Sequence, residues 1–571
     1  MAPGDLHRAT RRVAGARLGN PFAIGHTVQL GSDRARFLRH LPASALELRG
    51  THSIRRISDR LAGVSSVAMT TFGRFLTVAA VVMATSVQAQ RADDPIAKIR
   101  EADIKADLFA LAGDEMRGRE GGTLDEMDAS VWIAERAREA GLLPAGDNGT
   151  YFQFFPLERF RTSPGSTLTI GGTALRMGRD VVTDAPVLAM VDAPVVVTTM
   201  EAAAKADVKG RAMIVRFVPP VVDPAAPAQA GAAANVLRNW ARALQRNVAP
   251  LEPAAVIVLV GEAHADQWNR VAFPFSRGTY ALDVEGTAAP RAPTKGIPLL
   301  YVRESAAGTI APEARVEAAI FTDTFTYPSV NIVAKLPGRD PVLATEYVLF
   351  SAHQDHDGER YPVNGDAIWN GADDNATTSV ALLAIGRAFA AAPGRRSALF
   401  VWHGAEERGL MGSRWYAKHP TVPITSIVAV LNGDMMGRND PKTAALLGAV
   451  PPHRNSPDLV EMAHQANQAV TQFEVDSSWD EPAHREGWYY RSDHLPYARV
   501  GIPAIFFSTL LHPDYHTPFD NPDRIDIGKL TKMTKWMYAT GRAVAERPVR
   551  PALDPAFKLE RCRDFTGNYC S

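Results

Sequence analysis

Histidine and acidic side chains recur beside successive apolar segments in the C-terminal part of the chain. The stretches "SAHQDHDG", "NGADDNAT", "WHGAEERG", "LNGDMMG" and "HPDYHTPFDNPD" contain His353, Asp355, His356, Asp373, Asp374, Glu406, Glu407, Asp434, His512, Asp514, Tyr515 and His516. Imidazole nitrogens and carboxylate oxygens without thiolates suit borderline or hard divalent ions, and the mixture is typical of catalytic rather than structural zinc. The residue types therefore predict a catalytic metal site.

The number of acidic side chains indicates how many ions fit this site. Three ligand carboxylates and one bridging hydroxide supply a charge of about −4, which balances two divalent cations at about +4. A single ion would leave a surplus of negative charge in a buried place. We therefore predict two metal ions that share a water and lower its pKa.

The segments that carry these side chains have the composition of buried strands and helices. "EYVLFSAH", "SALFVWHG", "ITSIVAVLNGD" and "GIPAIFFSTL" are continuous apolar runs, and "NATTSVALLAIGRAFAA" has a helical pattern with Asn375 near its start. The alternation predicts an α/β fold with a mostly parallel sheet flanked by helices. Ligands of such sheets bind beyond the carboxyl ends of the strands, which would bring the stretches to one rim.

Taken in order, five motifs resemble one known family. "SAHQDHDG", "GADDN", "AEERGLMGS", "NGDM" and "YHTPFD" are similar to the motifs of the co-catalytic di-zinc aminopeptidases, a family of zinc exopeptidases that also contains glutamate carboxypeptidase and the glutaminyl cyclases. The resemblance covers about residues 325–545 and implies the zinc exopeptidase fold with two Zn²⁺ per chain. It implies that Asp374 bridges the ions, with His353 and Asp434 on one of them and Glu407 and His516 on the other.

The same resemblance implies roles for three further side chains. Glu406 matches the general base, which would take a proton from the metal-bridging water and pass it to the departing amine. Asp355 is similar to the acid that supports the metal-binding imidazole. Tyr515 resembles a tyrosine that donates to the oxyanion in some relatives, although it could instead simply pack. His356, Asp373, His403 and Asp493 are left without a role beyond loop contacts or hydrogen bonding.

Several domains are expected in a chain of 571 residues. Residues 94–160, with two helical patterns, and residues 325–548 are assigned to the catalytic domain. Residues 161–324 contain short β-like runs separated by Pro, Gly and Ala, and "VKGRAMIV" and "IPLLYV" in this segment resemble a protease-associated domain inserted ahead of the metal-binding loops. Such a domain could restrict access of substrates, or it could be a purely structural insertion.

The N-terminal part of the chain resembles a processing signal, and the C-terminal tail contains both cysteines. Residues 69–89 have a basic start, a short apolar core and a small-x-small ending, as a signal peptide does, and predict export to the periplasm or the extracellular space. Residues 1–68 would then be a mis-assigned start, with a disordered extension or an organelle presequence as the alternatives. In the tail, residues 549–571, Cys562 and Cys570 are expected to form one small disulfide in an exported protein.

Composition limits the partners. The 62 basic and 62 acidic residues cancel, which argues against nucleic acid or an anionic membrane recruited by bulk charge. No stable membrane anchor is expected, because no apolar stretch after the signal reaches about 18 residues. Peptide substrates are the expected partners, and the oligomeric state is not predicted.

The sequence therefore predicts a secreted zinc exopeptidase, with an aminopeptidase as the first hypothesis. A carboxypeptidase, a glutaminyl cyclase-like acyltransferase and a non-catalytic binding protein are the alternatives. Serine hydrolase chemistry is disfavoured because no G-x-S-x-G motif occurs. The direction of cleavage stays open, since Asp373, Arg408, Arg438 and Arg491 offer candidates for holding either end of a peptide.

Overall fold

The computed structural model describes residues 94–220, 235–282 and 296–559. The predicted signal peptide at 69–89, the segment 1–68 and the pair Cys562 and Cys570 lie outside these ranges and stay predictions. Within them, no helix is long and apolar enough to cross a bilayer.

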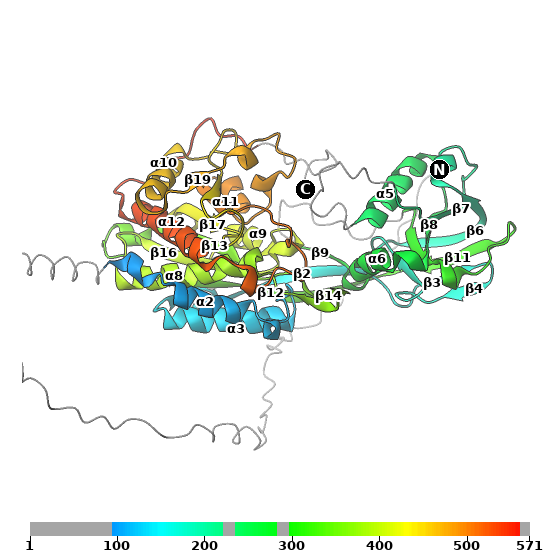
Figure 1. Cartoon of the computed structure of the whole chain (residues 1–571), viewed down its shortest axis with the longest axis horizontal. Helices are drawn as coiled ribbons and strands as arrows, with labels where there is room; N and C mark the ends of the chain where they lie inside the picture. The colour runs from blue at the N-terminus through cyan, green and yellow to red at the C-terminus, as the bar shows by residue number, and fades with distance from the viewer. Residues whose placement is uncertain (1–93, 221–234, 283–295, 560–571) are drawn as a thin grey trace, which may run out of the picture. The chain divides into compact units, whose positions relative to one another are not determined.

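The larger sheet has ten strands and contains the segments that lead to the metal-site residues (Figure 1). Nine of the strands follow in the order β19 (Glu474–Val475), β18 (Thr443–Leu447), β20 (Ala504–Ser508), β17 (Ile427–Gly433), β13 (Tyr347–His353), β16 (Ser397–His403), β12 (Thr322–Leu336), β2 (Phe152–Thr162) and β9 (Thr279–Ala281), and the tenth, β1 (Leu143–Pro144), pairs with β12. The four central strands β20, β17, β13 and β16 run parallel, whereas β12, β2, β9 and β1 are joined by antiparallel pairs. The predicted α/β class with helices around the sheet is confirmed, and the parallel part is its centre.

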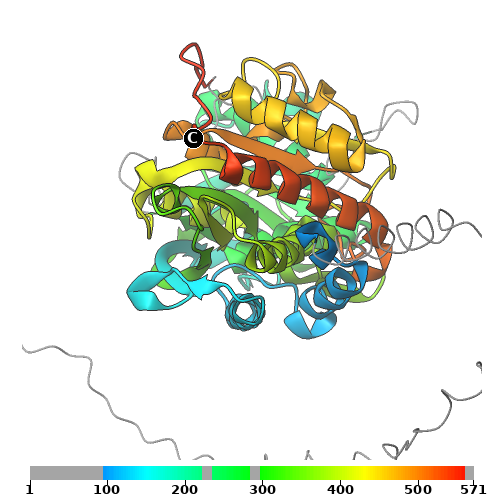
Figure 2. The same ribbon diagram turned by 90° about the vertical axis from the view of Figure 1, so that its left-hand side faces the viewer.

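Helices cover both faces of this sheet because its strands are apolar on both sides. The helices are α2 (Glu101–Leu111), α3 (Leu124–Glu139), α8 (Thr377–Ala391), α9 (Met411–Lys418), α10 (Pro457–Ala466), α11 (His494–Arg499) and α12 (Ile527–Glu546). Val348 and Phe350 of β13 belong to the core beneath α2, α8 and α12, whereas Leu349 packs with Tyr416 of α9 and Tyr497 of α11. This alternation follows from the two-residue period of a strand. Figure 2 shows α10 and α12 side by side on one face.

A second sheet of eight strands lies within residues 167–320. Its order is β4 (Thr173–Leu175), β3 (Thr167–Ile170), β11 (Arg315–Ile320), β6 (Ala189–Thr198), β7 (Ala212–Arg216), β8 (Ala255–Val260), β10 (Leu299–Arg303) and β5 (Val181–Thr183). It carries the helices α4 (Met200–Ala203), α5 (Val236–Val248), α6 (Ala265–Arg277) and α7 (Glu304–Ala307). Strand β9 falls inside the segment predicted as an insertion but pairs with β2 of the larger sheet. The domain boundaries and the likeness to a protease-associated domain remain predictions.

Candidate metal centre

The parallel strands deliver their chemically active residues to one edge of the larger sheet. Strand β13 ends at His353, and β17 ends one residue before Asp434. The short 3₁₀ turn that starts at Glu406 follows β16, and Asp374 lies in the turn before α8. Parallel strands place all their carboxyl ends on the same side, so residues far apart in the sequence meet there.

The first group of potential ligands contains His353, Asp374 and Asp434. The Nε2 atom of His353 lies 3.2 Å from an oxygen of Asp374 and 3.5 Å from an oxygen of Asp434. Ser492 donates a hydrogen bond of 2.8 Å to Oδ2 of Asp434, while Oδ1 of Asp434 is buried without a hydrogen-bond partner. A buried carboxylate oxygen left without a donor fits a position that a cation would satisfy.

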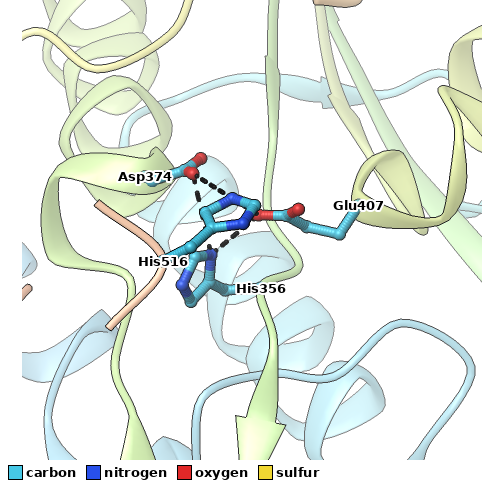
Figure 3. Close-up of side chains that lie close together, drawn as sticks. All are labelled: His356, Asp374, Glu407 and His516. Carbon is cyan, nitrogen blue, oxygen red and sulfur yellow. Dashed lines mark hydrogen bonds and ion pairs between the residues drawn. The ribbon is translucent and has the colours of Figure 1, made fainter. Parts of the chain in front are cut away.

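The second group contains His356, Asp374, Glu407 and His516, so that the two groups share Asp374 (Figure 3). The Nε2 atom of His516 lies 3.0 Å from Oδ2 of Asp374 and 3.3 Å from Oε1 of Glu407. His356 reaches the same Glu407 oxygen with Nδ1 at 2.9 Å, and its Nε2 is buried without a partner. All five side chains predicted as ligands are thus brought together, and His356 joins them.

The electrostatics of the two groups suit cations. Burial opposes protonation of His353, yet nearby carboxylates, Glu406 first among them, hold its pKa well above the ordinary value. Burial also disfavours the charge on Asp374, but hydrogen bonds from His353 and His516 hold the pKa of Asp374 well below its ordinary value. The donor set is purely nitrogen and oxygen, and a carboxylate shared by two groups fits a pair of divalent ions.

Glu406 lies beside the first group but outside the two sets of ligand atoms. Its Oε2 atom is 3.9 Å from Nε2 of His353, and its side chain is 10% exposed. Burial raises the pKa of Glu406 well above that of a free glutamate; the charges of Asp493, Glu407 and Asp434 add to this effect, and His353 opposes it. A carboxylate with a raised pKa next to a metal site is suited to accept a proton and release it again.

The backbone of the loop at 404–407 is held by two buried acids. Oδ1 of Asp355 accepts a hydrogen bond of 2.9 Å from the N–H of Glu406, and Oδ2 accepts one of 3.3 Å from Glu407. Asp355 contacts His353 through its main-chain carbonyl, 3.1 Å from Nδ1, whereas its carboxylate is 4.0 Å away. This carboxylate orients the backbone of the two glutamates, and its predicted support of the imidazole stays a prediction.

Glu126 of α3 is the second acid under this loop. Its carboxylate accepts hydrogen bonds from the N–H of Gly122 at 2.6 Å and from the hydroxyl of Ser329 at 2.8 Å. A Cβ atom at position 404 would lie only 2.4 Å from Oε1 of Glu126, which explains the glycine there. Burial, with a further contribution from the charge of Asp355, raises the pKa of Glu126 to about 8.

Arg119 ties two metal-site loops together from below. Its fully buried guanidinium donates to four carbonyl oxygens, those of Leu111 at 2.9 Å, Gln354 at 2.7 Å, Asn370 at 2.7 Å and Gly371 at 2.9 Å. Its own carbonyl accepts a hydrogen bond from the N–H of His356. Burial lowers the pKa of Arg119 to about 10, so the side chain stays a cation at neutral pH beneath the carboxylates.

Replacement of Arg119 by methionine is expected to lower the free energy of unfolding by about 3 kcal/mol or more, because buried carbonyls would lose their donors. Arg119→Lys should recover only part of this loss, since a lysine has three donors in a different geometry. Urea unfolding measures both. Arg117→Met is the matched control, because Arg117 is half exposed and its ion pairs with Asp125 and Glu359 lie at the surface. This substitution should lower the free energy of unfolding by about 1 kcal/mol or less. Equal losses for Arg119→Met and Arg117→Met would contradict this role.

Tyr515 lies against the second group. Its ring stacks on that of His516 with centroids 3.8 Å apart, and its hydroxyl accepts a hydrogen bond of 2.9 Å from Arg491. Burial raises the pKa of Tyr515, so that the phenol keeps its proton at neutral pH. Because the hydroxyl accepts from Arg491, its own proton can be donated elsewhere.

The residues that the sequence left without a role have different surroundings. Asp373 accepts a hydrogen bond of 2.7 Å from the N–H of Gly437 and lies 3.4 Å from His512. His403 is buried between Asn331 and Tyr497, at 3.3 and 3.2 Å, and belongs to neither ligand group. Asp493 is fully buried, and burial raises its pKa to about 7.

The arginines that could hold a peptide terminus are all engaged in ion pairs. Arg408 is paired with Asp357 and Glu120, Arg438 with Asp514, and Arg491 with Glu486.

Asn375, which the sequence placed near the start of a helix, makes no cap on α8. Its side chain donates to the carbonyl of Gly433 and accepts from the N–H of Met435.

Sequence reasoning missed Arg119, Glu126 and the participation of His356. Arg119 and Glu126 lie more than 220 residues before the loops that they support, in a segment with no metal-ligand pattern. The one local signal is the glycine-rich stretch "RGREGG", in which Arg119 follows Gly118 and has a left-handed φ of 50°. His356 stands three residues after His353, but that spacing alone does not distinguish a ligand from a loop residue.

Comparison with known proteins agrees with this geometry. Residues 331–540, which span every candidate ligand, match the model of Peptidase family M28. A protein named "Probable leucine aminopeptidase" from Trichophyton verrucosum (strain HKI 0517) is 24% identical over 245 residues, 41% of this chain and 62% of the relative. Leupeptin-inactivating enzyme 1 of Streptomyces exfoliatus is 28% identical over 203 residues, 34% of this chain and 40% of that protein. The chain thus spans less than two thirds of these relatives.

Among solved structures, a zinc aminopeptidase from Bacillus subtilis is similar with a TM-score of 0.49 and 17% identity, covering 79% of this chain and 96% of that chain. The family model and the motifs in "SAHQDHDG", "GADDN", "AEERGLMGS", "NGDM" and "YHTPFD" cover the same part of the sequence. Residues 331–540 of this chain, which hold all the candidate ligands, are thus similar to Peptidase family M28.

Proposed function

We propose that this protein is a zinc-dependent aminopeptidase that removes N-terminal residues from peptides. The observation that carries the proposal is the pair of ligand groups that share Asp374, with Glu406 beside them, inside the segment that matches Peptidase family M28. Relatives named as leucine aminopeptidases support the aminopeptidase direction.

In this proposal each group holds one Zn²⁺. His353 and Asp434 belong to one ion, Glu407 and His516 to the other, and Asp374 to both. His356 either completes the second ion's ligands or, through its contact of 2.9 Å with Glu407, orients that carboxylate. Two ions bound here would lower the pKa of a shared water and polarise the carbonyl of the scissile bond.

Glu406 is the proposed general base. It accepts a proton from the attacking water and then donates it to the amine of the departing peptide, so the same carboxylate serves twice. Burial, which raises the pKa of Glu406, favours this double use, because it increases the affinity of the carboxylate for a proton. Asp355 keeps the carboxylate in place through the backbone of the loop.

Tyr515 is the proposed donor to the oxyanion of the tetrahedral intermediate. Its phenol is protonated at neutral pH and can donate while it accepts from Arg491. It touches His516 directly, which puts the hydroxyl on the side of the second ligand group.

The test uses enzyme stripped of metal and reconstituted with Zn²⁺. A leucyl tripeptide and its C-terminal amide should both be cleaved at the N-terminal bond, whereas the N-acetylated tripeptide should react at least about a hundredfold more slowly. Cleavage of the acetylated peptide but not of the amide would make the protein a carboxypeptidase. Cyclisation of N-terminal glutamine with one tightly bound zinc would make it a glutaminyl cyclase, and no turnover of any peptide would favour a binding protein.

A further inference from the structure

A pocket of about 310 Å³ beside the metal centre is lined by five arginines. They are Arg238 and Arg242 of α5, Arg277 at the end of α6, Arg360 of strand β14 (Gly358–Val363) and Arg408 of the loop after β16. Arg408 directly follows the candidate ligand Glu407. Asp357, which contacts three of these arginines, lies 3.9 Å from His516. Asp357 therefore links the arginines of the pocket to His516 of the second ligand group.

On the side next to the metal centre, three arginines meet two carboxylates. Asp357 accepts from Arg277 at 3.1 Å, from Arg408 at 3.3 Å and from Arg360. Glu120 is paired with Arg277 at 2.7 Å and with Arg408 at 3.4 Å. One positive charge on this side is in excess.

The part of the pocket formed by α5 has a second excess cation. Asp184 accepts from Arg242 at 2.9 Å and lies 3.4 Å from Arg238, and the hydroxyl of Tyr301 also donates to it. Among the described residues paired with these arginines, five guanidinium groups thus face three carboxylates, which leaves a net charge of about +2.

The three arginines next to the metal centre are largely buried, whereas Arg242 is 45% exposed. The side chains of Arg408, Arg277 and Arg360 are 6%, 12% and 16% exposed. Burial disfavours the charge of Arg360 and lowers its pKa, a cost that the charge of Asp357 offsets only in part. An anion in the pocket would relieve that cost, since two like charges in a partly desolvated site repel each other strongly.

Aromatic rings hold the guanidinium groups in fixed planes. The guanidinium of Arg360 lies 3.9 Å from the ring centroid of Trp369 and 4.7 Å from that of Phe273, which also faces Arg277 at 4.8 Å. A planar, oriented guanidinium matches a carboxylate in a two-pronged hydrogen bond. The volume lies at the lower end of the range for small-ligand pockets and suits one amino-acid residue better than a larger ligand.

We propose that this pocket binds a carboxylate of the peptide substrate, either its C-terminal carboxylate or the side chain of an aspartate or glutamate, and so selects acidic or short peptides. The inference rests on the proposed peptidase function, because it places the rest of the peptide beyond the bond that the metal centre cleaves.

The experiment compares KM for four peptides with the same N-terminal leucine. Leu-Ala-Ala and its C-terminal amide test the chain end, and Leu-Ala-Glu-amide and Leu-Ala-Gln-amide test the side chain. At least one carboxylate peptide should have a KM about tenfold lower than its neutral partner, as expected for a charge-assisted hydrogen bond. The pair that shows the difference identifies the source of the carboxylate.

The variant Arg242→Gln/Arg360→Gln removes the two excess positive charges of the pocket. In this variant Asp184 is still paired with Arg238, and Asp357 is still paired with Arg277 and Arg408. In this variant the KM ratio should fall towards one. Arg246→Gln, an exposed position on α5 outside the pocket lining, is the matched control and should keep the ratio. Because Arg360 packs on Trp369, the single variant Arg242→Gln, at a half-exposed side chain, provides a milder test and should reduce the ratio in part.

Hydrolysis of the neutral amides reports on the proposed function, and the ratio reports on the pocket. A ratio near one in the unmodified enzyme, or an unchanged ratio in the double variant, would overturn the pocket assignment while leaving the peptidase assignment intact. If no peptide is cleaved, the proposed function fails, and calorimetric titration with the same four peptides decides about the pocket. Equal affinity for the charged and neutral peptides would then refute the proposal that the pocket binds a carboxylate.

Discussion

Replacement of Glu406 by glutamine is expected to reduce kcat by about 10² to 10⁴-fold while both metal ions stay bound. The amide has nearly the shape of the carboxylate but cannot accept a proton from water. Its backbone N–H would still donate to Asp355, so the loop should keep its conformation. Steady-state kinetics on a free-amine peptide, together with metal content by mass spectrometry, measures both parts of the prediction.

Two further variants separate this role from general damage. Glu407→Gln changes the neighbouring residue, which contacts His356 and His516, and should lose metal as well as activity. Glu481→Gln, at an exposed position, should change neither. If Glu406→Gln kept more than about a tenth of the activity, Glu406 would not be the base.

Replacement of Asp374 by asparagine is expected to remove both ions, because its two oxygens face different ligand groups. Oδ1 lies 3.2 Å from His353, and Oδ2 lies 3.0 Å from His516. Mutation of a residue that only hydrogen-bonds to a metal ligand typically lowers metal affinity by about 10 to 100-fold. Loss of a carboxylate shared by two ions should lower the affinity further. Metal analysis after dialysis should find fewer than one ion per chain, against two in the unmodified protein.

Asp434→Asn is the informative comparison, because Asp434 contacts the first group alone and should lose mainly one ion. Asp128→Asn, at an exposed position of α3, should keep both. Two tightly bound ions in Asp374→Asn would show that this residue does not bridge them. A single ion in the unmodified protein would remove the two-metal proposal itself.

The sequence by itself was sufficient to predict the α/β class and which side chains meet at one edge of the sheet. His353 and Asp434 lie at the ends of continuous apolar runs, and such runs are typical of parallel strands that are buried on both faces. Because parallel strands present their carboxyl ends together, the order of the motifs alone predicts that these residues converge. The match of residues 331–540 to Peptidase family M28 agrees with that prediction.

The tertiary structure alone decided which residues support and extend the centre. Arg119 and Glu126 reach the metal-site loops from a remote segment, and Asp355 accepts hydrogen bonds from the backbone of both glutamates. The arginine-lined pocket joins Arg242 to Arg360 across more than a hundred residues. Such contacts depend on how separate elements pack, and hydrophobic periodicity carries no information about which distant polar groups meet. Strand order therefore placed the candidate ligands, whereas packing between elements placed the residues that orient them.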